Sequence, residues 1–105
     1  MNMLNQVVLV GRIAKEPKLV DLGDDRKECN LKVAIQRQYK NEDGIYETDF
    51  VSCILYKGIA ENVTDYCRQG DLIGIKGRLE TKNDELVLVA DKVTFLSSSK
   101  VNEEE

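Results

Sequence analysis

Short segments in which apolar and polar residues alternate, separated by glycine and polar turn residues, run along most of this 105-residue chain. In the clearest segment, residues 28–37, every second residue is apolar: Cys29, Leu31, Val33 and Ile35. A period of two is typical of a half-buried β-strand, because successive side chains of a strand point to opposite faces. The pattern therefore predicts an all-β protein built from short strands.

Four further segments have the composition of strands and are bounded by turn residues. They cover residues 6–13, 47–57, 71–81 and 85–96. Gly11, inside the first of these segments, is a candidate bulge or sharp bend. The turn residues at 41–44 join the second and third predicted strands into a hairpin.

One segment between the third and fourth strands has a different period. From Gly58 to Gly70 the apolar residues recur at helical spacing, and Gly70 stands where a helix C-cap belongs. Three strands, one α-helix and two strands are the order of the OB-fold, a five-stranded Greek-key β-barrel. We therefore expect an OB-fold domain over residues 1–96 and a short polar, acidic tail over residues 97–105.

The acidic residues of the chain are partly concentrated at its C-terminal end. A net charge of −4 argues at first against nucleic acid, since proteins that bind phosphates usually carry a basic surface. However, three of the 19 acidic residues are Glu103, Glu104 and Glu105, and the remaining 16 face 15 basic residues. A local basic groove is compatible with this distribution.

Several classes of site find no support in the sequence. The chain has no histidine, which removes the commonest general base and metal ligand, and no nucleophile with a base or phosphate loop is found. We therefore predict no catalytic residues, no metal and no cofactor. Cys29, Cys53 and Cys67 are irregularly spaced and are expected to be reduced core residues. With no apolar stretch of about 20 residues and no signal peptide at its start, the protein is expected in the cytoplasm.

The third predicted strand carries two aromatic residues on one face. Alternation places Val51, Cys53 and Leu55 on the inner face, and Phe50 and Tyr56 on the outer face with Ser52 and Ile54. Phe50 and Tyr56 are then separated by about 20 Å of strand, and each fits base stacking, which is worth about 1–3 kcal/mol per base. Their burial in a subunit interface or under a loop is the alternative that the pattern leaves open.

The remaining aromatic residues are predicted to differ in their surroundings. Strict alternation turns Tyr39 inward unless its strand bends, whereas Tyr46, beside the turn, is a further stacking candidate. Tyr66, at helical spacing, and Phe95, in the last strand, are expected in the core. Phosphate contacts are predicted for dispersed basic residues, of which Lys32 and Lys57 are favoured by position. The set is Arg12, Lys15, Lys32, Arg37, Lys40, Lys57, Arg68 and Lys82.

Over residues 4–96 the chain resembles the bacterial single-stranded DNA-binding proteins and their phage and plasmid relatives. Six matching pieces occur in order. They are Leu4-Asn5-Gln6-Val7-Val8-Leu9-Val10-Gly11-Arg12, Glu16-Pro17, Thr48-Asp49-Phe50, Ala60-Glu61-Asn62-Val63, Gly77-Arg78-Leu79 and Ala90-Asp91-Lys92-Val93-Thr94-Phe95-Leu96.

The resemblance implies a homotetramer of OB-folds, with single-stranded DNA wrapped on its outside and stacked on Tyr39, Phe50 and Tyr56. It also implies that the second strand bends enough to expose Tyr39. The implied roles are in DNA replication, recombination and repair, for a nucleoid-associated protein or one encoded by a phage or mobile element. A module that binds RNA, or a scaffold subunit whose aromatic face is a protein interface, are the alternatives.

Three departures from the family pattern point to a reduced binder. The connection Lys82-Asn83-Asp84 replaces a longer hairpin with a further aromatic, and basic residues are missing near Gln6, Ser52 and Glu80. The C-terminal residues 101–105 are acidic but lack the apolar tip through which cellular members recruit replication and repair proteins. Fewer DNA contacts are therefore expected, and the recruitment of such partners is doubtful.

Overall fold

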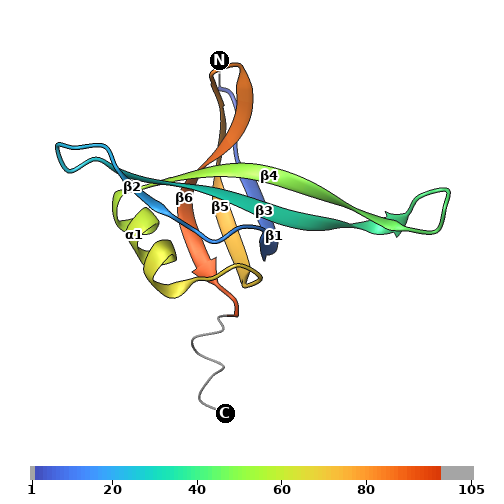
Figure 1. Cartoon of the computed structure of the whole chain (residues 1–105). Coiled ribbons are helices and arrows are strands. Elements are labelled where there is room, and N and C mark those ends of the chain that lie inside the picture. The colour runs from blue at the N-terminus through green and yellow to red at the C-terminus, as the bar shows by residue number, and fades with distance from the viewer. Residues whose placement is uncertain (1, 98–105) are drawn as a thin grey trace, which may run out of the picture.

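The computed structural model describes residues 2–97, which form a β-barrel with one helix (Figure 1). The five long strands and the helix match the predicted segments within a few residues. The short β2 is an addition that the sequence pattern did not predict. The elements are β1 (Val7–Ile13), β2 (Leu19–Asp21), β3 (Lys27–Lys40), β4 (Tyr46–Tyr56), α1 (Lys57–Tyr66), β5 (Leu72–Lys82) and β6 (Glu85–Phe95).

The strands form one sheet in the order β1-β5-β6-β4-β3-β2, which closes because β1 also pairs with β3. The closing pairs are Arg12↔Ala34 and Ile13↔Val33. Only the β4–β6 contact is parallel among the described strand pairs, and the others are antiparallel. Because β2 pairs with β3 alone, the barrel itself has five strands, with α1 between the third and fourth. This confirms the predicted OB-fold.

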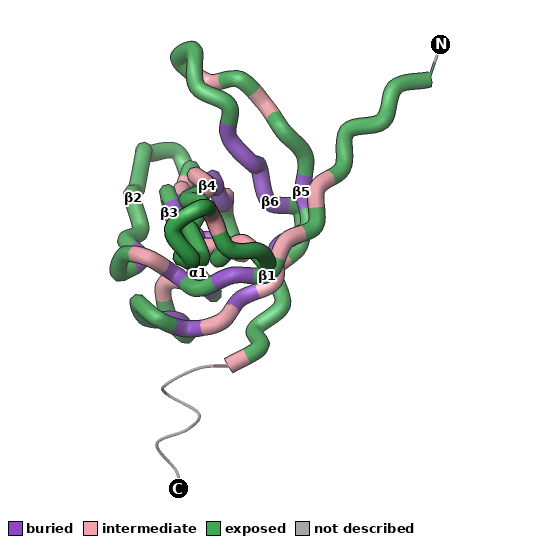
Figure 2. The backbone as a smooth tube through the Cα atoms, turned by 90° about the vertical axis from the view of Figure 1, so that its right-hand side faces the viewer, coloured by how far each residue is buried: buried purple, intermediate pink, exposed green. Residues whose placement is uncertain are grey.

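The core lies inside the barrel and is closed by α1 (Figure 2). In the barrel part of β3 and β4 every second residue points into it, and Val33 and Leu55 are fully buried. Ala60 and Val63 bury one side of α1. The three cysteines are free and buried, as predicted, and burial raises the pKa of the Cys53 thiol to about 12.

Two glycines allow the backbones of neighbouring strands to meet. Gly11 continues the regular β1–β5 register, so it is not a bulge in that pairing. A Cβ at Gly11 would lie 2.5 Å from the carbonyl oxygen of Ala34 on β3, so the glycine allows a close approach between backbones and not the predicted bulge. At Gly77, a Cβ would lie 2.1 Å from the carbonyl oxygen of Val89, next to a register shift between β5 and β6.

The predicted end of the helix was wrong. The helix α1 ends at Tyr66, and its C-cap Cys67 has extended backbone and donates its N–H to the Val63 carbonyl at 2.9 Å. Gly70 lies in the following turn with φ +95°. Its N–H donates to the Ile13 carbonyl at 2.8 Å, so this glycine joins the turn to β1.

The prediction that Tyr66 and Phe95 are core residues was also wrong. Their side chains are 56% and 43% exposed, and their rings lie 6.4 Å apart between centroids. Val63 of α1 and the C-cap residue Cys67 fill the core instead. Tyr66 therefore lies beside the buried stripe of the helix rather than within it.

Residues 98–105 are outside the described part of the chain, and they include most of the predicted tail over 97–105 and its acidic end. Within residues 2–97, no helix is long and apolar enough to cross a membrane. The same residues contain no cluster of cysteine and carboxylate side chains suited to a metal ion.

Candidate nucleic-acid interface

The outer face of the β3–β4 hairpin carries two of the predicted stacking residues, Phe50 and Tyr56, and two of the predicted basic residues, Lys32 and Lys40. The hairpin extends well beyond the barrel, with its turn at the far end (Figure 1). Its register pairs Ala34 with Phe50 and Lys32 with Ser52. Because directly opposite residues of an antiparallel pair share a face, these four side chains lie on one surface.

Phe50 is exposed at the middle of this surface. Its side chain is 61% exposed, as the alternation along the strand predicted. Its partner Ala34 is small, and Ala34 also pairs with Arg12 of β1. Arg12, Ala34 and Phe50 therefore form one row across three strands, in which a cation and an aromatic ring flank a methyl group. The row spans about 10 Å.

Tyr56 is half-buried, in contrast to Phe50. It packs against a second apolar cluster, outside the main core, formed by Ile54, Val87 and Val89. Ile54 was predicted on the outer face with Tyr56, and the cluster explains why its side chain is nevertheless only 8% exposed. The Tyr56 side chain is therefore packed against this cluster and only partly open to solvent.

Lys82 lies over the ring of Tyr56. The Lys82 ammonium is 5.8 Å from the ring centroid, which is within the range of a cation–π contact. The pKa of Lys82 is raised, chiefly by the side chain of Tyr56 and further by Glu80. Lys82 therefore stays protonated at neutral pH and brings a positive charge from the β5–β6 turn to the end of β4.

A groove of about 540 Å³ lies between Tyr56 and the β5–β6 turn. Three basic residues line it, namely Lys15, Lys32 and Lys82, together with the polar side chains of Asn30 and Ser52. Within residues 2–97, Lys15 and Lys32 take part in none of the ion pairs. The acids Glu28 and Glu85 stand at the same groove, so its surface is mixed with a basic excess.

A second groove of about 420 Å³ lies on the other side of Phe50. Arg12, Gln36, Gln38 and Thr48 contribute polar side chains to it. The Arg12 guanidinium donates from Nη1 to the Gly70 carbonyl at 3.0 Å, which fixes its position. Phe50 thus stands between two grooves that both carry hydrogen-bonding and cationic groups.

Tyr39 lies where the β3–β4 register changes. Gln36 pairs with Thr48 and Lys40 with Tyr46, so β3 has three residues against one on β4 in this interval. The irregularity adds two residues to β3, and Tyr39, which lies within it, is 65% exposed. At the same end, the Lys40 ammonium lies 5.7 Å from the ring centroid of Tyr46.

Arg37 is bound by two acids and is less suited to a phosphate contact. Its guanidinium forms a bidentate pair with Asp49, at 3.0 Å and 2.9 Å, and lies 3.5 Å from Glu47. These contacts raise the pKa of Arg37 and lower that of Asp49. Asp49 and Glu47 alternate with Phe50 along β4, so this ion-pair cluster lies on the opposite face of the hairpin.

The last two predicted basic residues, Lys57 and Arg68, lie at the start of α1 and after its end. Lys57, the first residue of α1, follows Tyr56 and lines a smaller cavity with Tyr56 and Lys82. Arg68 lies in the exposed turn after α1 and lines neither of the two grooves. The structure thus groups Lys15, Lys32 and Lys82, places Arg12 beside Phe50, and separates Arg68.

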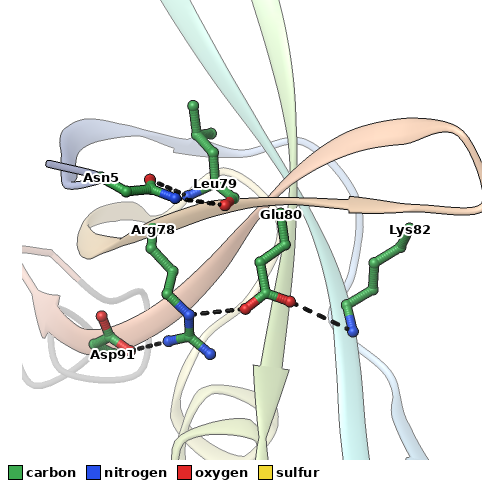
Figure 3. A network of polar contacts seen from close by, with 6 residues as sticks. All are labelled: Asn5, Arg78, Leu79, Glu80, Lys82 and Asp91. Atoms are coloured by element: carbon green, nitrogen blue, oxygen red, sulfur yellow. Dashed lines mark hydrogen bonds and ion pairs between the residues drawn. The ribbon is translucent and has the colours of Figure 1, made fainter. Parts of the chain in front are cut away.

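The outer face of the β5–β6 hairpin is a local network of opposite charges (Figure 3). Arg78 donates to Glu80 at 2.8 Å and to Asp91 at 2.6 Å, and Glu80 also lies 3.7 Å from Lys82. Asp91 is the extra residue at the register shift between β5 and β6, which turns its carboxylate toward Arg78. Asn5 binds the backbone of Leu79 beside this network through two hydrogen bonds. The positive charge of Arg78 is therefore balanced within the protein.

Residues 4–96 match the single-strand binding protein family. A similar protein is the single-stranded DNA-binding protein B of Bacillus subtilis, 38% identical over 103 residues, which is 90% of this chain and 91% of that protein. Another is the single-stranded DNA-binding protein of Oceanobacillus iheyensis, 35% identical over 105 residues, 91% of this chain and 65% of that protein. A third, the single-stranded DNA-binding protein 1 of Lactococcus lactis, is 36% identical over 107 residues, 93% and 71% of the two chains.

Proposed function

Because the chain belongs to the single-strand binding protein family, we propose that it binds single-stranded DNA without sequence preference and without catalysing a reaction. The observation that carries this proposal is the exposed ring of Phe50, placed between two grooves with cationic groups. Every base offers a π-face to such a ring, so stacking tolerates any sequence. In a duplex these faces are already stacked on each other.

In this proposal the DNA runs along the outer face of the β3–β4 hairpin. One base stacks on Phe50, and a second lies against Tyr56 in the larger groove, where the hydrogen-bonding groups of Asn30 and Ser52 face it. Tyr39, exposed near the hairpin end, is a third stacking residue. Lys82 moves from its place over the Tyr56 ring to a phosphate when the base arrives.

The phosphates are neutralised by the basic residues that border this path. Arg12 stands in the same row as Phe50, and Lys15 and Lys32 line the groove without an ion pair inside the described chain. Lys40 and Lys57 extend the positive charge toward the two ends of β4. Each phosphate contact releases counterions from the DNA, so binding weakens as salt increases. The DNA so bound is the single strand exposed in replication, recombination and repair.

We further propose that the protein acts as a homo-oligomer, a tetramer by family resemblance. Val8 and Val10 point outward from β1 and are 69% and 50% exposed. Apart from its last two residues, β1 is paired on one side only among the described strands, which leaves a strand edge open. An apolar face next to an open edge is typical of a surface covered by a second chain.

Titration with oligo-dT, a matched RNA and a duplex of equal length tests the proposed ligand. We expect salt-sensitive binding of the single-stranded DNA at micromolar protein or below, and weaker binding of the duplex. Absence of salt-sensitive binding to oligo-dT would refute the proposal, and preferential binding of RNA would favour an RNA-binding module.

The mass of the protein in solution tests the oligomer. The wild type is expected at four times the chain mass and Val10→Glu at a lower multiple, because a carboxylate in the apolar contact is left unpaired. A wild-type protein at the mass of a single chain would contradict this part of the proposal. Val10 also lines the second groove, so Val10→Glu is expected to change DNA binding as well as the mass.

A further inference from the structure

At the far end of the β3–β4 hairpin, a tyrosine and a lysine face each other across the two strands. Lys40 and Tyr46 are direct partners in the register, and the Lys40 ammonium lies 5.7 Å from the ring centroid of Tyr46. The Tyr46 side chain is 45% exposed. The ring is thus held in place by a neighbour and remains open to solvent.

Tyr46 shares a face with Phe50. The register irregularity lies in β3, where three residues oppose one, so the alternation along β4 continues through Tyr46, Thr48 and Phe50. Four residues of extended strand place Tyr46 about 13 Å beyond Phe50. The residues between them on this face, Thr48 and its partner Gln36, are exposed and uncharged.

The charges of the hairpin are segregated between its two faces. The face with Phe50 and Tyr46 carries Lys32 and Lys40 and, between these two lysines, no acid from β3 or β4. The acids of this part of β4, Glu47 and Asp49, lie on the other face, where they bind Arg37. Glu42 and Asp43 belong to the turn beyond Tyr46 and mark the outer limit of the positive face.

We propose that Tyr46, held by Lys40, is a further base-stacking residue that extends the binding path from Phe50 to the end of the hairpin. The proposal rests on single-stranded DNA as the ligand. A base stacks on the exposed ring, and Lys40 binds the adjoining phosphate. A single strand leaving Phe50 along β4 reaches Tyr46 without passing an acidic side chain, and the turn acids beyond it oppose further extension.

This inference predicts an effect that depends on the length of the DNA. Oligo-dT of increasing length is titrated into the wild type, Tyr46→Leu, Tyr46→Phe and Phe50→Ala, with Tyr66→Leu as a matched control on an exposed tyrosine of α1. Tyr46→Leu should bind long oligonucleotides at least about fivefold more weakly than the wild type and the shortest ones equally. Tyr46→Phe keeps the ring and should match the wild type, as should Tyr66→Leu.

The outcomes separate this inference from the function on which it rests. If the wild type does not bind oligo-dT at any length, the function itself fails. If the wild type binds and Phe50→Ala weakens it, but Tyr46→Leu matches the wild type at every length, only the role of Tyr46 is overturned. Equal weakening at all lengths, or a changed mass of Tyr46→Leu in the absence of DNA, would also overturn it, because Tyr46 would then act through the fold or an assembly contact.

A second measurement on the unaltered protein covers the case in which Tyr46→Leu does not fold. With ring-labelled tyrosine, NMR follows each of the four tyrosine rings during titration. The Tyr46 ring resonances should shift with long oligo-dT and stay in place with the shortest, whereas Tyr66 should not respond to either. No shift at Tyr46 with a saturating long oligonucleotide would overturn the inference.

Discussion

Arg12 and Phe50 lie on either side of Ala34 in one row of cross-strand partners. This row lies where β1 pairs with β3 and closes the barrel. The pairing that closes the barrel therefore also places the Arg12 cation beside the exposed ring of Phe50. Gly11 allows this closure because a larger residue would meet the backbone of Ala34. The candidate interface is therefore built into the way the barrel closes.

Replacing Phe50 with alanine should weaken binding of oligo-dT by about 1–3 kcal/mol, the value of one stacked base. The domain should keep its free energy of unfolding, because the side chain is 61% exposed and contributes little to the core. Fluorescence titration and urea unfolding measure the two quantities. Unchanged affinity in a folded variant would show that the DNA does not use this ring.

Lys32→Gln should reduce the dependence of binding on salt, since Lys32 lines the groove beside Tyr56. The slope of log affinity against log salt should decrease by about 0.7, the contribution of one phosphate of a single strand. Arg78→Gln is the matched control, because Arg78 is neutralised by Glu80 and Asp91. A slope that changes more in Arg78→Gln than in Lys32→Gln would place the DNA over the β5–β6 hairpin.

Gly77→Ala should destabilise the barrel without touching the binding face. Its Cβ would lie 2.1 Å from the carbonyl oxygen of Val89, so the β5–β6 backbones must separate. We expect a loss of about 1–3 kcal/mol in the free energy of unfolding, as for other overpacked sites. Gly58→Ala, which meets no atom within 4 Å, should be neutral or slightly stabilising. Equal stability of the two variants in urea would contradict this account of Gly77.

The carboxyl group of Asp49 should titrate below its ordinary pKa of about 3.9, because the Arg37 side chain donates two hydrogen bonds to its charged form. A lowered pKa in the folded state means that the ion pair stabilises the hairpin above the ordinary pKa and that this contribution is lost as pH falls through the lowered value. NMR titration of the carboxyl carbon measures the shift. Arg37→Gln should return the pKa toward its ordinary value, and an unchanged pKa would show that the pair does not form in solution.

The sequence was sufficient for the barrel strands, the helix and the outward face of Phe50, because each depends on a local period of two or of helical spacing. It did not predict β2, since Leu19–Asp21 has three residues and shows no period of its own. It also did not predict the burial of Ile54, which depends on packing against Val87 and Val89 from a distant strand.

The sequence also could not predict which basic residues are already paired with acids in the fold. Arg37 was grouped with the phosphate-binding residues, yet its ion pair with Asp49 depends on the β3–β4 pairing and the register shift that follows it. The neutralisation of Arg78 likewise depends on the bulge at Asp91. A basic residue can be counted from sequence, but its partners are set by strand register.

Binding of DNA on the outer face of the β3–β4 hairpin is tested most directly by mapping where bound DNA touches the protein. Oligo-dT carrying 5-iododeoxyuridine is bound to the wild type and irradiated, and the crosslinked peptides are identified by mass spectrometry. Crosslinks are expected within Tyr46–Tyr56, at Phe50 first of all. Crosslinks confined to Tyr66 and Phe95, the exposed aromatic pair at the end of α1 and β6, would contradict it.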